Sequence, residues 1–262
     1  MHQEKLTSRL KRILVAAQRQ TSIFIIKVGF NRKGGSVRHL RLGTDYGGWW
    51  VPEVFLNQED RKLLISAGLG HDISFEKEML NFGFEVVGLD PLPECIEYAS
   101  VQLSEYKKVS LINKGLWISS GKIDFYSPTS KNSDAYSITN SHFNESAEIL
   151  QFEVISLEHL QEQLRDAPID EYELVVLKLD IEGAEIQILS DYFSDVRKKF
   201  DFVAFELDSV SLIPFWKFKE RIVAIHLARK LMKQLSELGY VLTLTEGYNF
   251  HWVAKNGIRL VD

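Results

Sequence analysis

From residue 61 onward, short apolar runs alternate with stretches in which apolar residues recur every three or four positions. A continuous apolar run predicts a strand buried on both faces of a sheet, and the longer period predicts a helix. The predicted strands are Leu63–Ala67, Glu85–Leu89, Val109–Ile112, Glu173–Leu179 and Phe202–Glu206, with a closing antiparallel pair at Tyr240–Thr245 and Asn249–Ala254. The predicted helices are Asp72–Phe82, Pro93–Tyr106, Gly183–Phe193 and Phe215–Leu238. This alternation predicts a doubly wound α/β fold with a mostly parallel sheet and helices on both faces.

The first 58 residues follow a different pattern, which predicts an N-terminal helix and hairpin extension ahead of a core domain over residues 59–262. Residues 4–19 predict an amphipathic helix whose apolar stripe comprises Leu6, Leu10, Ile13, Leu14 and Ala17. Such a basic helix packs on its own protein or on a twin subunit, forming a homodimer, or it lies on a membrane surface. Ser22–Phe30 and Val37–Leu42 predict the strands of a hairpin that turns at Asn31–Gly35.

Charge is spread unevenly along the chain. The net charge is −5, but residues 1–50 hold ten Lys and Arg against two acidic residues, so the rest of the chain is strongly acidic. This asymmetry predicts that the first fifth of the chain faces something acidic, either a ligand or the remainder of the protein. The acidic core disfavours nucleic acid as a partner.

Cysteine content and hydropathy indicate the compartment. The single cysteine, Cys95, excludes an intrachain disulfide framework and a cysteine-based zinc site, which fits a reducing environment. Apolar runs are far shorter than the roughly 20 residues of a spanning helix, so no membrane span is expected. We therefore expect a cytoplasmic protein.

The loop after the first core strand has the pattern of a nucleotide-binding turn. Gly68 and Gly70 stand between a predicted strand and a predicted helix, where glycine allows a tight turn and a close approach to a ligand. Asp90 ends the next strand, and a carboxylate at that place can accept both hydroxyl protons of a ribose. Together these features predict a nucleoside-binding half.

Two residues in this loop distinguish between nucleoside cofactors. The dinucleotide fingerprint needs a third small residue, but Ile73 occupies that position. Asp72 places a negative charge at the start of the helix, which repels a phosphate and suits a cation. S-adenosylmethionine carries a sulfonium and no phosphate, so it is favoured over NAD. The alternatives left open are an NAD-type oxidoreductase or epimerase, and a catalytically inactive binding or scaffold protein.

Carboxylates follow two of the later strands. Asp180 closes the apolar run Leu174–Leu179, and Glu206 and Asp208 end the next strand, so the three are expected to meet at adjoining strand tips. They could bind a substrate hydroxyl, act as a general base, or hold a divalent cation, for which we assign no site. His71, within the glycine loop, is a further candidate base because its pKa lies near neutral pH.

Three segments carry a resemblance to a known family. Leu64–Glu76, Val87–Pro91 and above all the Lys-Leu-Asp-Ile-Glu-Gly-Ala-Glu block at 178–185 resemble the FkbM-type S-adenosylmethionine-dependent methyltransferases, over roughly residues 43–255. The resemblance implies a class I, Rossmann-like fold with a seven-stranded sheet and methyl transfer to a hydroxyl oxygen, often on a sugar or natural product. Ser66 departs from the pattern, because many class I methyltransferases carry an acid there that helps to hold the methionine ammonium; Asp72 or Glu76 could replace it.

Loop geometry and resemblance together assign the candidate site. The candidate catalytic residues are Asp180, Glu206 and His71. The candidate cofactor-binding residues are Ser66, Ala67, Gly68, Leu69, Gly70, Asp72, Ser74, Asp90, Pro91, Lys114, Gly115, Leu116 and Asp180.

The basic N-terminal segment indicates the kind of acceptor. Tyr46, Trp49 and Trp50 surround flexible glycines and suit the flat face of a sugar ring, while Arg38 and Arg41 suit an acidic group. We therefore expect a small hydroxylated acceptor, such as a glycan, approached from the N-terminal side. The alternative is that residues 1–50 form a dimer interface.

Overall fold

A seven-stranded sheet forms the centre of the computed structural model, which describes residues 2–30, 37–57, 61–128, 133–139, 147–164, 168–195, 200–214 and 216–255. The strand order is β11-β12-β10-β9-β3-β4-β5. The strands are β3 (Lys62–Ala67), β4 (Phe84–Leu89), β5 (Val109–Ile112), β9 (Leu174–Leu179), β10 (Phe202–Glu206), β11 (Tyr240–Glu246) and β12 (Asn249–Ala254). The first five run parallel, and β12 pairs antiparallel with both β10 and β11. The predicted fold class is confirmed.

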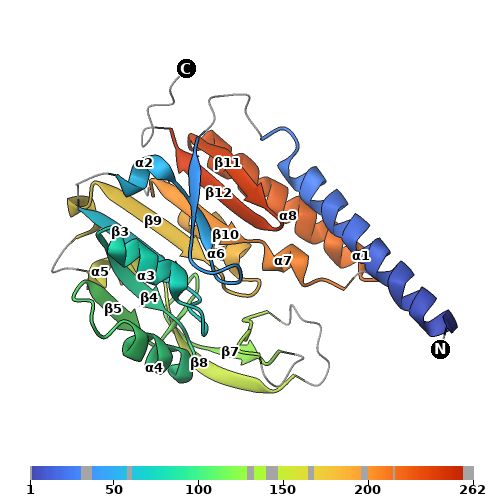
Figure 1. Cartoon of the computed structure of the whole chain (residues 1–262), viewed down its shortest axis with the longest axis horizontal. Coiled ribbons are helices and arrows are strands. Elements are labelled where there is room, and N and C mark those ends of the chain that lie inside the picture. Colours follow the sequence, from blue (N-terminus) through green and yellow to red (C-terminus); the bar gives the residue numbers. More distant parts are fainter. Residues whose placement is uncertain are drawn as a thin grey trace.

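Helices cover both faces of this sheet (Figure 1). The helices are α1 (His2–Lys27), α2 (Glu53–Leu56), α3 (Ser74–Asn81), α4 (Pro93–Gln102), α5 (Leu157–Gln163), α6 (Glu185–Tyr192), α7 (Asp208–Ser211) and α8 (Phe218–Glu237), with a 3-10 turn at Ile169–Glu171. Residues of β9 alternate between two cores: Leu177 and Leu179 pack with α6 and α8, and Val176 packs with α3. Burial on both faces explains why this strand is continuously apolar. No described helix is long and apolar enough to cross a membrane.

A small second sheet was not predicted. Strands β6 (Gly115–Leu116), β7 (Gly121–Tyr126) and β8 (Ile149–Ile155) form it in the order β6-β8-β7. Its β8 strand alternates between more and less exposed positions, so it lacks the apolar run that marks the central strands. A bridge between Tyr126 and Ser137 ties the described segment 133–139 to this sheet.

The N-terminal segment corrects the expected hairpin. Helix α1 continues to Lys27, so the strand expected at Ser22–Phe30 is wrong. Ser22, Ile23 and Ile26 are buried with helical spacing, and the last two belong to the same core as α8. Tertiary packing of this face outweighs the strand preference of a β-branched run. The expected turn at 31–35 lies outside the described residues.

The strand expected at Val37–Leu42 does form, with another partner. It is β1 (His39–Leu42), and it pairs antiparallel with β2 (Trp49–Pro52). Trp49 and Val51 are buried in the core that contains Met79 of α3. The N-terminal extension therefore shares its apolar core with the central sheet.

Candidate active site

The loop that connects β3 to α3 passes close to the end of β9. Gly68 has a φ of +81°, and a Cβ at that position would lie 1.7 Å from the backbone oxygen of Asp180. The parallel pairing of β3 with β9, which places Ala67 opposite Leu179, brings the two backbones this close. Gly68 is therefore required both for its backbone angle and for the space it leaves. Asp180 lies beside the glycine loop, as the sequence predicted.

Asp90 holds this loop in place. Its Oδ2 atom accepts hydrogen bonds from the backbone N–H groups of Leu69 and Gly70, both at 3.0 Å, and its Oδ1 accepts one from Leu92 at 2.9 Å. Burial raises the pKa of the Asp90 carboxyl, and these three bonds partly offset that rise. The carboxylate lines the cavity described below, so it can still accept further hydrogen bonds there.

Asp90→Ala is expected to weaken cofactor binding by more than about tenfold and to lower the melting temperature. The substitution leaves three backbone donors without their charged acceptor, and each such bond contributes about 1.5–3 kcal/mol. Calorimetry with S-adenosylhomocysteine and thermal unfolding measure the two effects. Asp124→Ala, on strand β7, is the control and should change neither. Unchanged affinity in Asp90→Ala would place the nucleoside elsewhere.

The loop opens onto a cavity of about 700 Å³ at the carboxyl ends of the parallel strands. This is where α/β sheets bind ligands, and the volume suits a cofactor together with part of an acceptor. The predicted site residues that line the cavity are Gly68, Leu69, Gly70, His71, Asp72, Asp90, Pro91, Gly115, Asp180 and Glu206. The structure thus brings residues from four strand ends into one chamber.

Five predicted cofactor residues are not among those that line this cavity. Ser66 and Ala67 are buried within β3, and Leu116 is buried in the core. The Lys114 ammonium lies 3.4 Å from a carboxylate oxygen of Glu153. Ser74 lines a neighbouring pocket and accepts a hydrogen bond from the backbone of Thr44. For these residues, a direct contact with the cofactor stays a prediction.

Ser66 belongs to a buried network beneath the loop. Its hydroxyl donates to Oε1 of Glu76 at 2.6 Å, and the Lys178 ammonium lies 3.7 Å from the same oxygen. Lys178 also donates to the backbone oxygen of Gly68 at 2.5 Å. Glu76 therefore supplies a carboxylate near the end of β3, where the family pattern has an acid. This carboxylate is buried and pairs with Lys178.

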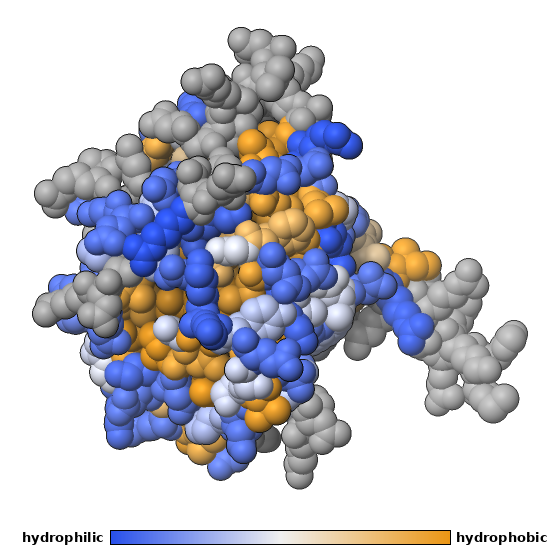
Figure 2. Space-filling view, turned by 60° about the vertical axis from the view of Figure 1, so that its left-hand side comes forward, coloured by the Kyte–Doolittle hydropathy of each residue, from blue (hydrophilic) through white to orange (hydrophobic). Residues whose placement is uncertain are grey.

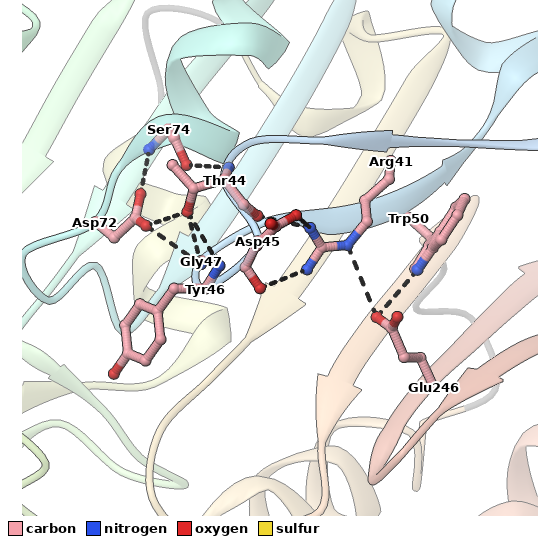
Figure 3. Close-up of polar contacts among 9 residues, drawn as sticks. All are labelled: Arg41, Thr44, Asp45, Tyr46, Gly47, Trp50, Asp72, Ser74 and Glu246. Atoms are coloured by element: carbon pink, nitrogen blue, oxygen red, sulfur yellow. Dashed lines mark hydrogen bonds and ion pairs between the residues drawn. The ribbon is translucent and has the colours of Figure 1, made fainter.

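Asp72 fastens the β1–β2 connection to the glycine loop (Figure 3). Its carboxylate accepts hydrogen bonds from the Thr44 hydroxyl, from the Gly47 N–H at 3.2 Å and from the Ser74 N–H at 3.0 Å. Burial alone would raise the pKa of Asp72, but the hydrogen bonds from Ser74, Thr44 and Gly47 outweigh it and lower the pKa. Asp72, whose charge was predicted to lie at the start of a helix, therefore anchors the β1–β2 connection.

The other side of the same connection is held by Arg41. Its guanidinium donates to the backbone oxygens of Thr44 at 2.7 Å and Asp45 at 3.1 Å, and it lies 3.8 Å from Glu246 (Figure 3). Trp50 donates its indole N–H to the same Glu246 at 3.0 Å. The anchored loop leaves Tyr46 91% exposed at the wall of the cavity. Trp49 is buried, so of the expected aromatic cluster Tyr46 is the member that lines the cavity.

Three carboxylates meet at the ends of β9 and β10, as predicted. Ligand oxygens of Asp180, Glu206 and Asp208 lie within 4.8 Å of one another. Burial, then the charges of Asp180 and Glu185, raise the pKa of Glu206 to about 7. Burial and the charges of Asp180 and Glu206 raise the pKa of Glu182, which also lines the cavity, to about 8. Glu182 was missed as a site residue, although its alternation with Lys178 and Asp180 was the available signal.

This cluster has the oxygen ligands that a divalent cation prefers. The spacing would let one cation bridge Asp180, Glu206 and Asp208. The same geometry serves a general base, because crowded carboxylates share protons near neutral pH. A chelator distinguishes the two roles, as described below.

His71 has a partner that the sequence did not reveal. Its Nδ1 lies 2.7 Å from an oxygen of Asp134, and its ring packs against Tyr98 with centroids 5.4 Å apart. Asp134 lies between two segments outside the described residues and far from any periodic pattern, so no local signal marked it. His251, by contrast, is buried beside Phe202 and Trp49, and burial lowers its pKa to about 3. That histidine is a neutral core residue.

Comparison with known proteins decides the family. A model described as the methyltransferase FkbM domain matches residues 51–242. The protein belongs to the FkbM methyltransferase family. The matched region begins in β2 and ends in β11, so it contains the glycine loop, Asp90 and the carboxylate cluster. A search of curated proteins finds no match.

Among solved structures, this FkbM-family chain is similar to the N-methyltransferase NodS from Bradyrhizobium japonicum WM9. The identity is 10% and the TM-score 0.34, over 92% of this chain and 96% of the other. The family match and the strand order identify the architecture as a Rossmann-like methyltransferase fold.

Proposed function

We propose that the protein transfers a methyl group from S-adenosylmethionine to a hydroxyl oxygen of a small acceptor such as a sugar, a glycan or a natural product. The observation that carries this proposal is a single cavity lined both by the glycine loop with Asp90 and by the carboxylates of Asp180 and Glu206. When bound, S-adenosylmethionine supplies an electrophilic methyl carbon.

The glycine loop and Asp90 fit this ligand. Gly68, Leu69 and Gly70 line the cavity, and Asp90 offers its carboxylate to ribose hydroxyls. Asp72, Asp90 and Asp180 line the cavity and make it negative, which favours the sulfonium and ammonium groups and disfavours a pyrophosphate. This charge pattern supports S-adenosylmethionine over a dinucleotide.

The carboxylate cluster of Asp180, Glu206 and Asp208 suits the activation of an alcohol. An alcohol oxygen attacks well only as its proton leaves, and a base is most effective when its pKa lies near the working pH. Glu206, with a pKa raised to about 7, meets that condition, and Asp180 lies beside it. The His71–Asp134 pair is the second candidate base, with Asp134 orienting the ring.

The charges around the acceptor side favour a neutral, hydroxylated acceptor. Arg38, expected to meet an acidic group, lies 3.6 Å from Glu53, and Arg41 is held as described. Neither is among the residues that line the cavity, whereas Asp180, Glu182 and Glu206 are. Of the cations that line the cavity, Lys178 pairs with Glu76 and Arg221 is buried against the Val210 carbonyl, whereas Arg19 is exposed. An acidic acceptor would therefore meet more carboxylates than cations. Tyr46 and the exposed Trp216 offer aromatic faces suited to a sugar ring.

Calorimetry with S-adenosylmethionine, S-adenosylhomocysteine and NAD tests the cofactor, and we expect the first two to bind and NAD not to bind. A screen of hydroxylated acceptors with methyl-labelled cofactor then tests the reaction. Binding of NAD alone would support an oxidoreductase instead. Binding of the adenosyl ligands with no turnover on any acceptor would indicate a binding protein, and a product methylated on nitrogen would overturn the oxygen assignment.

A further inference from the structure

Helix α1 has two apolar faces, of which one is left exposed. Its inner face, which includes Ile23 and Ile26, packs into the core shared with α8. The opposite side, here called the outer face, consists of Ile13, Leu14, Phe24 and Ile25, all exposed; Leu14 and Phe24 are each 60% exposed. At about 100° per residue, these four positions fall within an arc of about 120°.

Of the three alternatives for the predicted apolar stripe, packing on its own protein is contradicted for the members that the structure describes. Ile13, Leu14 and Ala17 are all exposed. The helix extends past the rest of the molecule toward its N-terminus (Figure 1). In Figure 2 the projecting arm carries hydrophobic side chains beside hydrophilic ones. An exposed apolar face of this kind marks an interaction surface.

Charge identifies the partner. Residues 2–27 contain six Lys and Arg against one acidic residue, in a protein whose net charge is −5. Arg9 and Lys27 occupy helical positions on one border of the outer face and Lys11 on the other, each about 40° from its edge. An apolar arc bordered by basic residues is the pattern of a helix that lies in the interface of an anionic membrane. Two copies of such a helix would instead place like charges against each other.

We propose that the outer face of α1 docks the protein onto the surface of a membrane that contains anionic lipids. The apolar side chains would enter the headgroup region, and the basic residues would meet the lipid charges. Val15 and Arg19, which line the cavity, occupy the opposite side of the helix, so docking leaves the cavity accessible. This inference is independent of the proposed reaction.

Co-sedimentation of the full-length protein with vesicles tests the proposal. We expect binding to vesicles of phosphatidylcholine and phosphatidylglycerol in equal parts, little binding to phosphatidylcholine alone, and weaker binding at high salt. The double variant Leu14→Gln/Phe24→Gln should bind the anionic vesicles at least about tenfold more weakly, because it removes most of the apolar area that enters the interface. Lys27→Gln, at the border of the outer face, should reduce binding by roughly fivefold.

Matched controls separate docking from surface hydrophobicity in general. Val101, on α4, is an apolar side chain of similar exposure, 64%, and Val101→Gln should leave vesicle binding unchanged. Lys108→Gln, at an exposed basic position between α4 and β5, is the control for Lys27→Gln. Melting temperatures should be equal in the double variant and in Val101→Gln, because their altered side chains are exposed.

Three results would overturn the proposal. One is a protein that does not sediment with anionic vesicles. Another is a double variant that binds them as well as the wild type. The third is a wild-type dimer, measured by light scattering, that Leu14→Gln/Phe24→Gln converts to a monomer, because the outer face would then be covered by a second copy of the chain.

Discussion

Gly68→Ala is expected to abolish cofactor binding, whereas Gly83→Ala, at nearly the same backbone angle, should leave it unchanged. The φ angles are +81° and +86°, so both substitutions carry the same conformational cost, about 1–2 kcal/mol. Only at Gly68 would the new Cβ collide with another backbone, at 1.7 Å from the Asp180 oxygen. Nothing lies within 4 Å of the corresponding position at Gly83.

The collision at Gly68 must be relieved by moving either the glycine loop or the end of β9. Either movement displaces Leu69 and Gly70 from Asp90, or Asp180 from the cavity wall. Calorimetry with S-adenosylhomocysteine measures binding, and thermal unfolding measures the shared conformational cost. Cofactor affinity that is equal in the two variants would show that the close approach of the two backbones does not shape the cofactor site.

Glu206→Gln and Asp180→Asn are expected to lower turnover by about a hundredfold or more, which is the range for loss of a general base. Each substitution keeps the shape of the side chain and removes its charge. Asp201→Asn is the matched control: Asp201 directly precedes β10, at the opposite end of that strand from Glu206, and accepts a hydrogen bond from the Val175 N–H. It should lower the melting temperature and leave turnover unchanged.

The pH profile tests the same groups. Burial and neighbouring charges raise the pKa of Glu206 to about 7, so turnover should rise with pH up to about 7 and then level off. Glu206→Gln should remove this rise. Turnover that is independent of pH in the wild type, or a profile unchanged in Glu206→Gln, would exclude Glu206 as the base. Activity that a chelator abolishes would instead assign the carboxylates to a divalent cation.

The stability of the folded protein should fall as pH rises, whereas turnover should increase. Glu182, Glu185 and Glu206 have pKa values of about 8, 7 and 7 in the folded protein, above the ordinary value of 4.5. The folded protein therefore binds more protons than the unfolded chain between these limits, and its stability falls as pH rises from about 5 to 8. Melting temperatures measured across this range, without cofactor, should decrease.

The sequence alone determined the central architecture and the place of three residues that line the cavity. Strands β3, β4, β9 and β10 are buried on both faces, so each is marked by its own composition. Gly68, Asp90 and Asp180 could be placed because each directly follows such a strand, and parallel strands end at the same edge of a sheet. These are local signals combined with one general rule of topology.

Only the tertiary structure decided the remaining features, because they depend on contacts between segments far apart in the chain. The run at Ser22–Ile26 is helical because α8 offers an apolar surface to one of its faces. Asp134 meets His71 across 63 residues, and Asp72 binds the β1–β2 connection, which lies 28 residues earlier at Thr44. The raised pKa values arise because the fold buries Glu182, Glu185 and Glu206 and brings other carboxylates close to Glu182 and Glu206. No residue shows in its own segment how deeply it will be buried or which charges will face it.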